Sequence, residues 1–162
     1  MKRTLTVFSV IFIVFLIITT SALCETWEVK KTHDNLDNVY DIAQVKNNEG
    51  FVFTVEEGFY TIGTLITPNK NVAASMDRQI IKFQIDNYEI ERKTPQYRSN
   101  GREIDIGLSE KNIKRMAKGQ VVKISYYKKT GELIDIKFDL NGSCISLFKI
   151  FDSPRFFSCH NE

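Results

Sequence analysis

The strongest constraint on the fold is a regular alternation of apolar and polar residues between positions 122 and 140. A period of two places the apolar side chains on one face of a β-strand, so the pattern favours strands that bury a single face. The two alternating runs are separated by Lys128-Lys129-Thr130-Gly131, in which the glycine can adopt the positive φ of a tight turn. We therefore predict a hairpin made of residues 122–126 and 134–140.

Other segments extend the β prediction over most of the chain. Residues 51–55 and 81–85 alternate in the same way, and weaker strand patterns cover residues 27–31, 39–45, 59–66 and 102–106. The expected architecture is mainly β: an antiparallel β-sandwich or open barrel with two short α-helices. One helix precedes the last hairpin and the other is C-terminal.

The first predicted helix carries a basic stripe. Ser109 can cap a helix that runs to about Lys118 and stops at Gly119. Its inner side is expected to hold Ile113, Met116 and Ala117, and the opposite face holds Lys111, Lys114, Arg115 and Lys118. That stripe is either a docking site for an acidic partner, anionic lipid or glycan, or an ordinary solvated face.

The second predicted helix begins near Ser143, after Asn141-Gly142, and must stop before Pro154. Helical spacing places three residues on one face, which we expect to line the core: Cys144, Phe148 and Phe151.

The chain opens with the composition of a secretory signal peptide. Lys2 and Arg3 precede an unbroken apolar run over residues 7–18, and small residues follow at 19–22. A membrane span needs about 20 apolar residues, so the run fits a cleaved signal better than a retained anchor, which stays the alternative.

Two cleavage points satisfy the rule for small residues, one before Leu23 and one before Glu25. Cleavage before Glu25 removes Cys24 and leaves an even number of cysteines, so we favour it. Leu23 occupies the place where a lipoprotein signal needs a small residue, which argues against lipidation of Cys24. We expect residues 1–24 to be a cleaved signal peptide and residues 25–162 to form a single periplasmic or secreted domain, with no stable membrane span after cleavage.

The remaining cysteines, Cys144 and Cys159, can pair as a disulfide in an oxidising compartment. The competing interpretation is a zinc or redox site that also uses His160 and His33. The cysteines lack C-x-x-C spacing and the chain has only two histidines, so we predict no metal and no cofactor.

Charge excludes one class of partner. The whole chain has 22 Lys+Arg and 20 Asp+Glu, and the only charged residues before Glu25 are Lys2 and Arg3. Residues 25–162 are therefore neutral, with 20 residues of each sign. Nucleic-acid binding relies on a surplus of cations, so we expect none.

Catalytic patterns are sparse. The chain has no G-x-S-x-G, H-E-x-x-H or glycine-rich phosphate loop. The acid pairs Glu56-Glu57 and Asp86 with Glu89 resemble turn and strand-edge residues more than the two carboxylates of a glycosidase. We therefore expect a protein that binds rather than catalyses.

A second candidate binding segment is a polar loop at residues 92–101, which contains Tyr97 and Arg98.

The order of elements carries a resemblance. Its first half rests on Trp27-Glu28-Val29, on residues 35–37 before the strand from Val39, and on Phe83-x-Ile85-Asp86. Its second half rests on the Ser109 helix, the hairpin through Gly131, Phe138-Asp139-Leu140-x-Gly142, Leu147 and Cys159. This pattern resembles the exported type VI secretion-associated VasI/TagO-like family and, more distantly, the invasion-associated locus B proteins.

The resemblance implies an exported accessory protein of a Gram-negative bacterium, or of an element it carries, that acts at the envelope or on a host. It also implies a cysteine in an early core strand, which residues 51–55 lack, so Cys144 would take its place. No catalytic residue carries over. The expected function is a non-enzymatic binding protein, secretion-system or virulence associated, whose partner is an envelope or host protein or cell-wall glycan. Alternatives are a periplasmic inhibitor or immunity protein against an enzyme, toxin or phage, and a cell-wall hydrolase.

Overall fold

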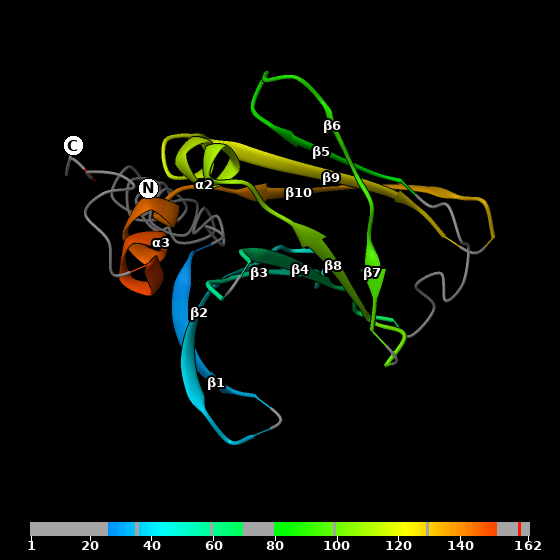
Figure 1. Cartoon of the computed structure of the whole chain (residues 1–162). Helices are drawn as coiled ribbons and strands as arrows, with labels where there is room; N and C mark the ends of the chain where they lie inside the picture. Colours follow the sequence, from blue (N-terminus) through cyan, green and yellow to red (C-terminus); the bar gives the residue numbers. More distant parts are fainter. Residues whose placement is uncertain are drawn as a thin grey trace, which may run out of the picture.

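Two antiparallel sheets face each other in a computed structural model that describes residues 26–34, 36–58, 60–69, 80–98, 100–128, 130–151 and 159 (Figure 1). This arrangement, with one helix before the last hairpin and one at the C-terminus, confirms the predicted mainly β fold. The predicted signal peptide lies outside the described residues. Within them, no helix combines the length and the apolar character needed to cross a bilayer.

The larger sheet has six strands in the order β1-β2-β3-β4-β8-β7. Its first four strands form consecutive hairpins, and β8 then pairs with β4. The bounds are β1 Glu28–His33, β2 Val39–Lys46, β3 Val52–Glu56, β4 Ile62–Ile66, β7 Gln96–Tyr97 and β8 Glu103–Gly107.

The smaller sheet has four strands in the order β10-β9-β5-β6. Its bounds are β5 Ile81–Ile85, β6 Glu91–Lys93, β9 Val121–Tyr127 and β10 Leu133–Asp139. The last two strands form the predicted hairpin: Ile124 pairs with Ile136, and Gly131 has φ +84° in the turn. The alternation seen in the sequence therefore sets which face of this sheet is buried.

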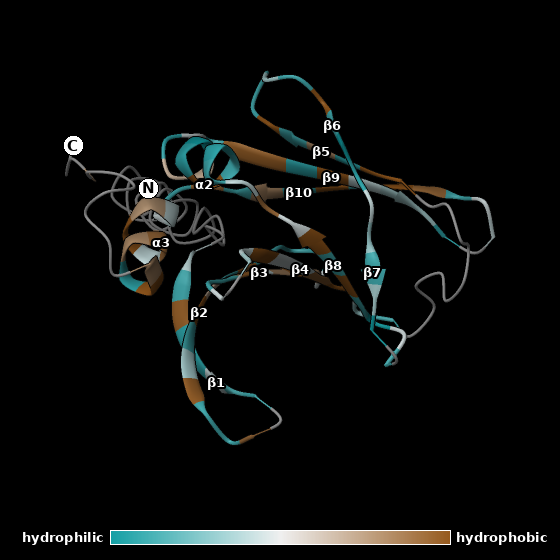
Figure 2. Cartoon of the chain, viewed as in Figure 1, coloured by the Kyte–Doolittle hydropathy of each residue, from teal (hydrophilic) through white to brown (hydrophobic). Residues whose placement is uncertain are grey.

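Aromatic contacts join the two sheets. The ring centroid of Phe53, on β3, lies 5.7 Å from that of Phe138 on β10 and 6.4 Å from that of Phe83 on β5. The indole Nε1 of Trp27 donates a hydrogen bond to the Asp139 carbonyl at 2.8 Å. Figure 2 shows hydrophobic residues along β8 and β9, whereas much of α2 (Glu110–Met116) is hydrophilic.

The second helix, α3 (Ser143–Phe151), packs on β1 and β2. Its buried apolar side is formed by Leu147, Ile150 and Phe151, whereas Phe148 is 40% exposed. The prediction that Phe148 lines the core was therefore wrong, because the helix is rotated so that Leu147 rather than Phe148 points inward. The buried Ser143 hydroxyl donates to the Met116 carbonyl at 2.8 Å and links the two helices.

The segment from residue 91 to 98 corrects another prediction. It is not a loop: β6 pairs with β5 in the smaller sheet, and β7 pairs with β8 in the larger one. The chain passes between the sheets at Thr94-Pro95. Both strands lie at sheet edges and are mainly polar, so they lack the apolar alternation by which strands are recognised.

Candidate functional site

The first helix, α2, is fixed at its N-terminus by a capping box. The Ser109 hydroxyl oxygen accepts a hydrogen bond from the Asn112 backbone N–H at 3.2 Å, and Asn112 Oδ1 accepts from the Ser109 N–H at 2.9 Å. Ser109 was the predicted cap. Asn112 takes the place that Glu or Gln usually occupies in this motif.

Asn112 also anchors the helix to the sheet. Its side chain is fully buried, and Nδ2 donates to Glu91 Oε1 at 2.7 Å. Its Oδ1 accepts from Lys93 Nζ at 3.0 Å. Glu91 and Lys93 belong to β6, so one amide holds α2 against the edge of the smaller sheet. A buried amide is tolerated only when it is paired in this way.

Glu91 is the charged centre beneath the helix. Its carboxylate lies 2.8 Å from Lys93 Nζ and 3.8 Å from Arg115 Nη1. Burial alone would raise the pKa of Glu91, but hydrogen bonds from Lys93 and Asn112 and the charges of Lys93 and Arg115 outweigh burial and lower it. The carboxylate is therefore held in its charged form.

Arg115 lies between this acid and an aromatic ring. Its guanidinium carbon is 4.0 Å from the ring centroid of Tyr88, in the turn that joins β5 to β6. Stacking of this kind orients the guanidinium and adds a cation–π attraction. The turn is itself anchored, because Asp86 Oδ1 accepts hydrogen bonds from the backbone N–H groups of Gln120 and Val121.

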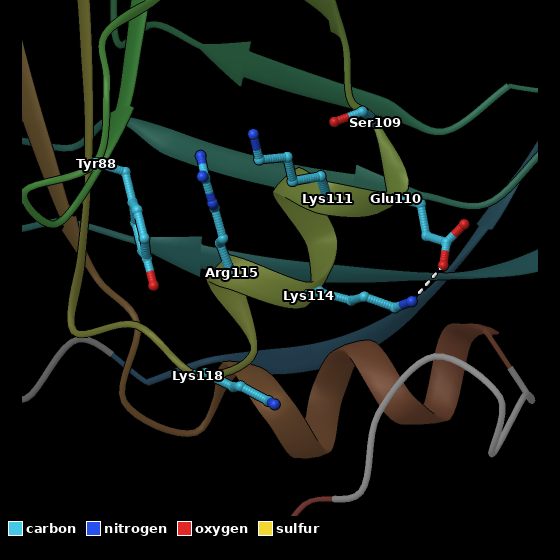
Figure 3. A pocket seen from close by; sticks show the side chains of 7 residues that line it. All are labelled: Tyr88, Ser109, Glu110, Lys111, Lys114, Arg115 and Lys118. Carbon is cyan, nitrogen blue, oxygen red and sulfur yellow. Dashed lines mark hydrogen bonds and ion pairs between the residues drawn. The ribbon is translucent and has the colours of Figure 1, made fainter.

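A groove runs between α2 and this turn, with a volume of about 540 Å³ (Figure 3). It is lined by Tyr88, Ser109, Glu110, Lys111, Lys114, Arg115 and Lys118. The structure thus brings together all four residues of the predicted basic stripe and adds Tyr88 to them. We call this set of side chains the α2 groove.

The four cations of the α2 groove are not equally available. Lys114 pairs with Glu110 one turn earlier, and Arg115 is engaged by Glu91 and Tyr88. Lys111 and Lys118 are exposed, and neither side chain makes an ion pair or hydrogen bond within the part of the chain that the structure describes. These two ammonium groups leave the groove net positive and give it capacity for an anionic group.

The other predicted binding pair, Tyr97 and Arg98, does not line the α2 groove. Tyr97 is half-buried on β7 and pairs with Ile104, and burial raises the pKa of its hydroxyl. Arg98 Nε donates to Asp105 Oδ2 at 2.8 Å, and this bond raises the pKa of the guanidinium. The predicted exposed aromatic loop is therefore part of the sheet edge.

Cys144 and Cys159 form a disulfide with a Cα–Cα distance of 5.8 Å. This is the pairing predicted from the cysteine count, and it leaves neither sulfur as a thiolate ligand. His33 ends β1 and is exposed, whereas His160 lies outside the described residues. The described ranges contain no group of three His, Cys, Asp or Glu side chains that is arranged to hold a metal ion.

Sequence reasoning missed Tyr88, Glu91, Lys93 and Asn112. Only the strand pairing would have revealed them, because Glu91 and Lys93 contact Asn112 of α2 once β6 is paired with β5. Asn112 stands three residues after the predicted cap, where a capping box has its second partner, but this spacing does not indicate that its side chain is buried against β6.

Comparison with known proteins identifies the fold. The structure is similar to the crystal structure of the invasion associated protein B from Bartonella henselae, with a TM-score of 0.60 and 12% sequence identity over 80% of this chain and 94% of that chain. No protein-family description matches the sequence, and no curated protein matches it. The likeness therefore shows a shared architecture.

Proposed function

We propose that this chain is an exported binding protein, without catalytic activity, whose α2 groove docks an acidic segment of a protein at the bacterial envelope or on a host. The observation that carries the proposal is the pair of unneutralised lysines, Lys111 and Lys118, on either side of a stacked Arg115–Tyr88 pair. Such a groove matches a carboxylate-bearing peptide. Its carboxylates would pair with Lys111 and Lys118, and the stacked Arg115–Tyr88 pair would lie between them.

The fixed position of α2 supports this role. Asn112, Glu91 and Lys93 pin the helix from below, so the groove is formed before a partner arrives. A preformed site loses less conformational entropy on binding. Because α2 is held in place, the α2 groove also differs from an ordinary solvated helix face, where charged side chains have no fixed neighbours.

Export is supported by the signal-like N-terminus and by the disulfide, which is typical of oxidising compartments. The Bartonella protein is described as invasion associated, and the shared fold is consistent with a virulence-associated role here. A place beside a type VI secretion system is a narrower proposal that rests on the short VasI/TagO-like motifs alone.

The two alternatives have less support. An inhibitor acting through an aromatic loop would use Tyr97, which is half-buried in β7. A hydrolase would use paired carboxylates, but Asp86 accepts bonds from two backbone N–H groups, and Tyr40 donates to Glu56 at 3.4 Å. These contacts favour structural roles for both acids.

The test is capture with a position-specific crosslinker. We expect a photo-crosslinker in place of Glu110, which lines the groove, to trap a discrete acidic protein from envelope extract. The K111E/K118E variant should bind the isolated partner at least tenfold more weakly, equivalent to about 1.4 kcal/mol, because two attractive contacts become repulsive.

The matched control is K31E/K46E, which reverses two exposed lysines on β1 and β2. It should bind like wild type. Equal losses in both variants, or peptidoglycan cleavage by the pure protein without any trapped partner, would contradict the proposal.

A further inference from the structure

The outer face of the smaller sheet carries a second cationic surface, separate from the α2 groove. On β5, Ile81 and Phe83 are buried, so Lys82 and Gln84 point away from the core. By the same alternation Arg92 points outward from β6, whereas its neighbours Glu91 and Lys93 contact Asn112 of α2.

The strand register places like charges opposite each other on this face. Lys82 pairs with Arg92, and Lys123 on β9 pairs with Lys137 on β10. Gln84 pairs with Lys123, so Lys82 and Lys123 are diagonal neighbours. Directly opposed residues lie about 5 Å apart and diagonal ones about 7–8 Å, so the four cations form a zigzag across the sheet.

The protein offsets this repulsion only in part. None of the four side chains makes an ion pair within the described ranges, but Asp135 and Asp139 share the outer face of β10 with Lys137. Like charges directly opposite each other destabilise a sheet. Two such pairs on one face, in a domain that is neutral over residues 25–162, concentrate positive charge where an anionic ligand can bind.

The surface is also hollowed. A depression of about 270 Å³ is lined by Lys82, Gln84, Ile90, Lys123, Ser125, Asp135, Ile136 and Lys137. Three lysines surround it, and Ser125, Asp135 and Gln84 Oε1 add short polar groups that bond hydroxyls. The four strands span about 14 Å, which accommodates a short run of a linear polymer.

We propose that this outer face of the smaller sheet binds an acidic polysaccharide, with its carboxylate or sulfate groups on the lysines and its hydroxyls on Ser125 and Asp135. The lining contains no aromatic side chain on which a nucleic-acid base would stack. The mixture of cations and hydroxyl-bonding groups therefore matches a sugar polymer better than a nucleic acid or an anionic bilayer.

The experiment measures binding of a short heparin oligosaccharide to the purified protein at two salt concentrations. Replacing two cations by K123Q/K137Q should weaken binding about tenfold and reduce its salt dependence, because two ionic contacts are lost. The variant K31Q/K46Q on the larger sheet removes the same charge and should change binding less than about twofold.

Thermal unfolding supplies the second readout. Removing an opposed pair of lysines should leave the melting temperature unchanged or raise it, since their repulsion is relieved. If K123Q/K137Q fails to fold, K82Q/R92Q tests the same band. Equal weakening by K123Q/K137Q and K31Q/K46Q would overturn the proposal. So would binding of single-stranded DNA or phosphatidylglycerol vesicles that is as tight as that of heparin and equally sensitive to K123Q/K137Q.

Discussion

At the scale of single residues, Asn112 holds α2 in a fixed position against β6. Its side chain serves as the third residue of the capping box and also bonds Glu91 and Lys93 on β6. Burying an amide is unfavourable unless it is hydrogen-bonded, and here Nδ2 donates to Glu91 while Oδ1 accepts from Ser109 and Lys93. The polar contacts beneath α2 therefore depend on one another.

We expect N112A to lower the free energy of unfolding by about 1–3 kcal/mol, because the variant removes the hydrogen bonds of a fully buried amide and leaves the half-buried Glu91 without one of its partners. Urea unfolding followed by circular dichroism measures this loss. The matched control is N87A, at an exposed position in the β5–β6 turn, which should change stability by less than about 0.5 kcal/mol. Similar values for the two variants would show that the buried amide contributes nothing special.

Glu91 gives a prediction about pH. Its pKa in the folded protein lies below the ordinary value, so its charged form stabilises the fold above that ordinary value, and this contribution is lost as the pH falls towards the folded pKa. E91Q should therefore be less stable than wild type at neutral pH, and the difference should shrink below about pH 5.

Melting temperatures of wild type and E91Q across this pH range test the prediction. The N87A variant changes no titratable group, so its difference from wild type should not depend on pH. A constant difference between wild type and E91Q would contradict the role assigned to the carboxylate.

Residue patterns predicted part of this site and missed the rest for a physical reason. The cap at Ser109 and the four cations of α2 follow from helical spacing, which is local. Tyr88 and Glu91 join the site only through the β5–β6 turn, whose position depends on sheet pairing. Long-range contacts of this kind leave no periodic signal in the chain.

At the scale of elements, β4 needs a residue without a side chain at one position for the two sheets to pack. Gly63 on β4 faces the interior, where an added Cβ would lie 2.9 Å from Phe53 Cζ and 2.9 Å from Leu108 Cδ1. Because Phe53 is also the residue that contacts the opposite sheet, it has little room to move.

G63A should therefore destabilise the protein by about 1–3 kcal/mol, the usual cost of overpacking a core. The neighbouring strand offers a matched control: G107A adds the same methyl group where no atom lies within 4 Å. We expect G107A to be neutral or slightly stabilising. Chemical denaturation of both variants compares them directly, and equal effects would contradict the role of close approach at Gly63.

Elements with apolar alternation were predictable, and edge elements were not. The β9–β10 hairpin has one buried and one exposed face, so its register follows from the sequence pattern. In contrast, β6 and β7 are short polar edge strands whose hydrogen bonds are satisfied on one side only. The helix α3 was predicted in place, but its rotation depends on packing against β1 and β2.

At the scale of the whole molecule, the sheets and helices are joined by a few long-range links. Phe53 connects the two sheets, Trp27 connects the start of the larger sheet to β10, and the Ser143 hydroxyl connects α3 to α2. The disulfide extends this chain of links to Cys159, the last described residue. A covalent tie at this end restrains the unfolded chain as well as the folded one.

The double variant C144A/C159A should lower stability by about 3 kcal/mol, the entropy expected for a loop of 15 residues, and lower the melting temperature by roughly 10 °C. Reductant should lower the melting temperature of wild type to a similar value and leave the double variant unchanged. Reductant breaks the disulfide but keeps both sulfur atoms, whereas the double variant removes them. Equal decreases in melting temperature would therefore show that the covalent link, and not the packing of the sulfur atoms, provides the stability. A wild-type melting temperature that does not respond to reductant, with two free thiols found by mass spectrometry, would contradict the disulfide and with it the main structural support for an oxidising compartment.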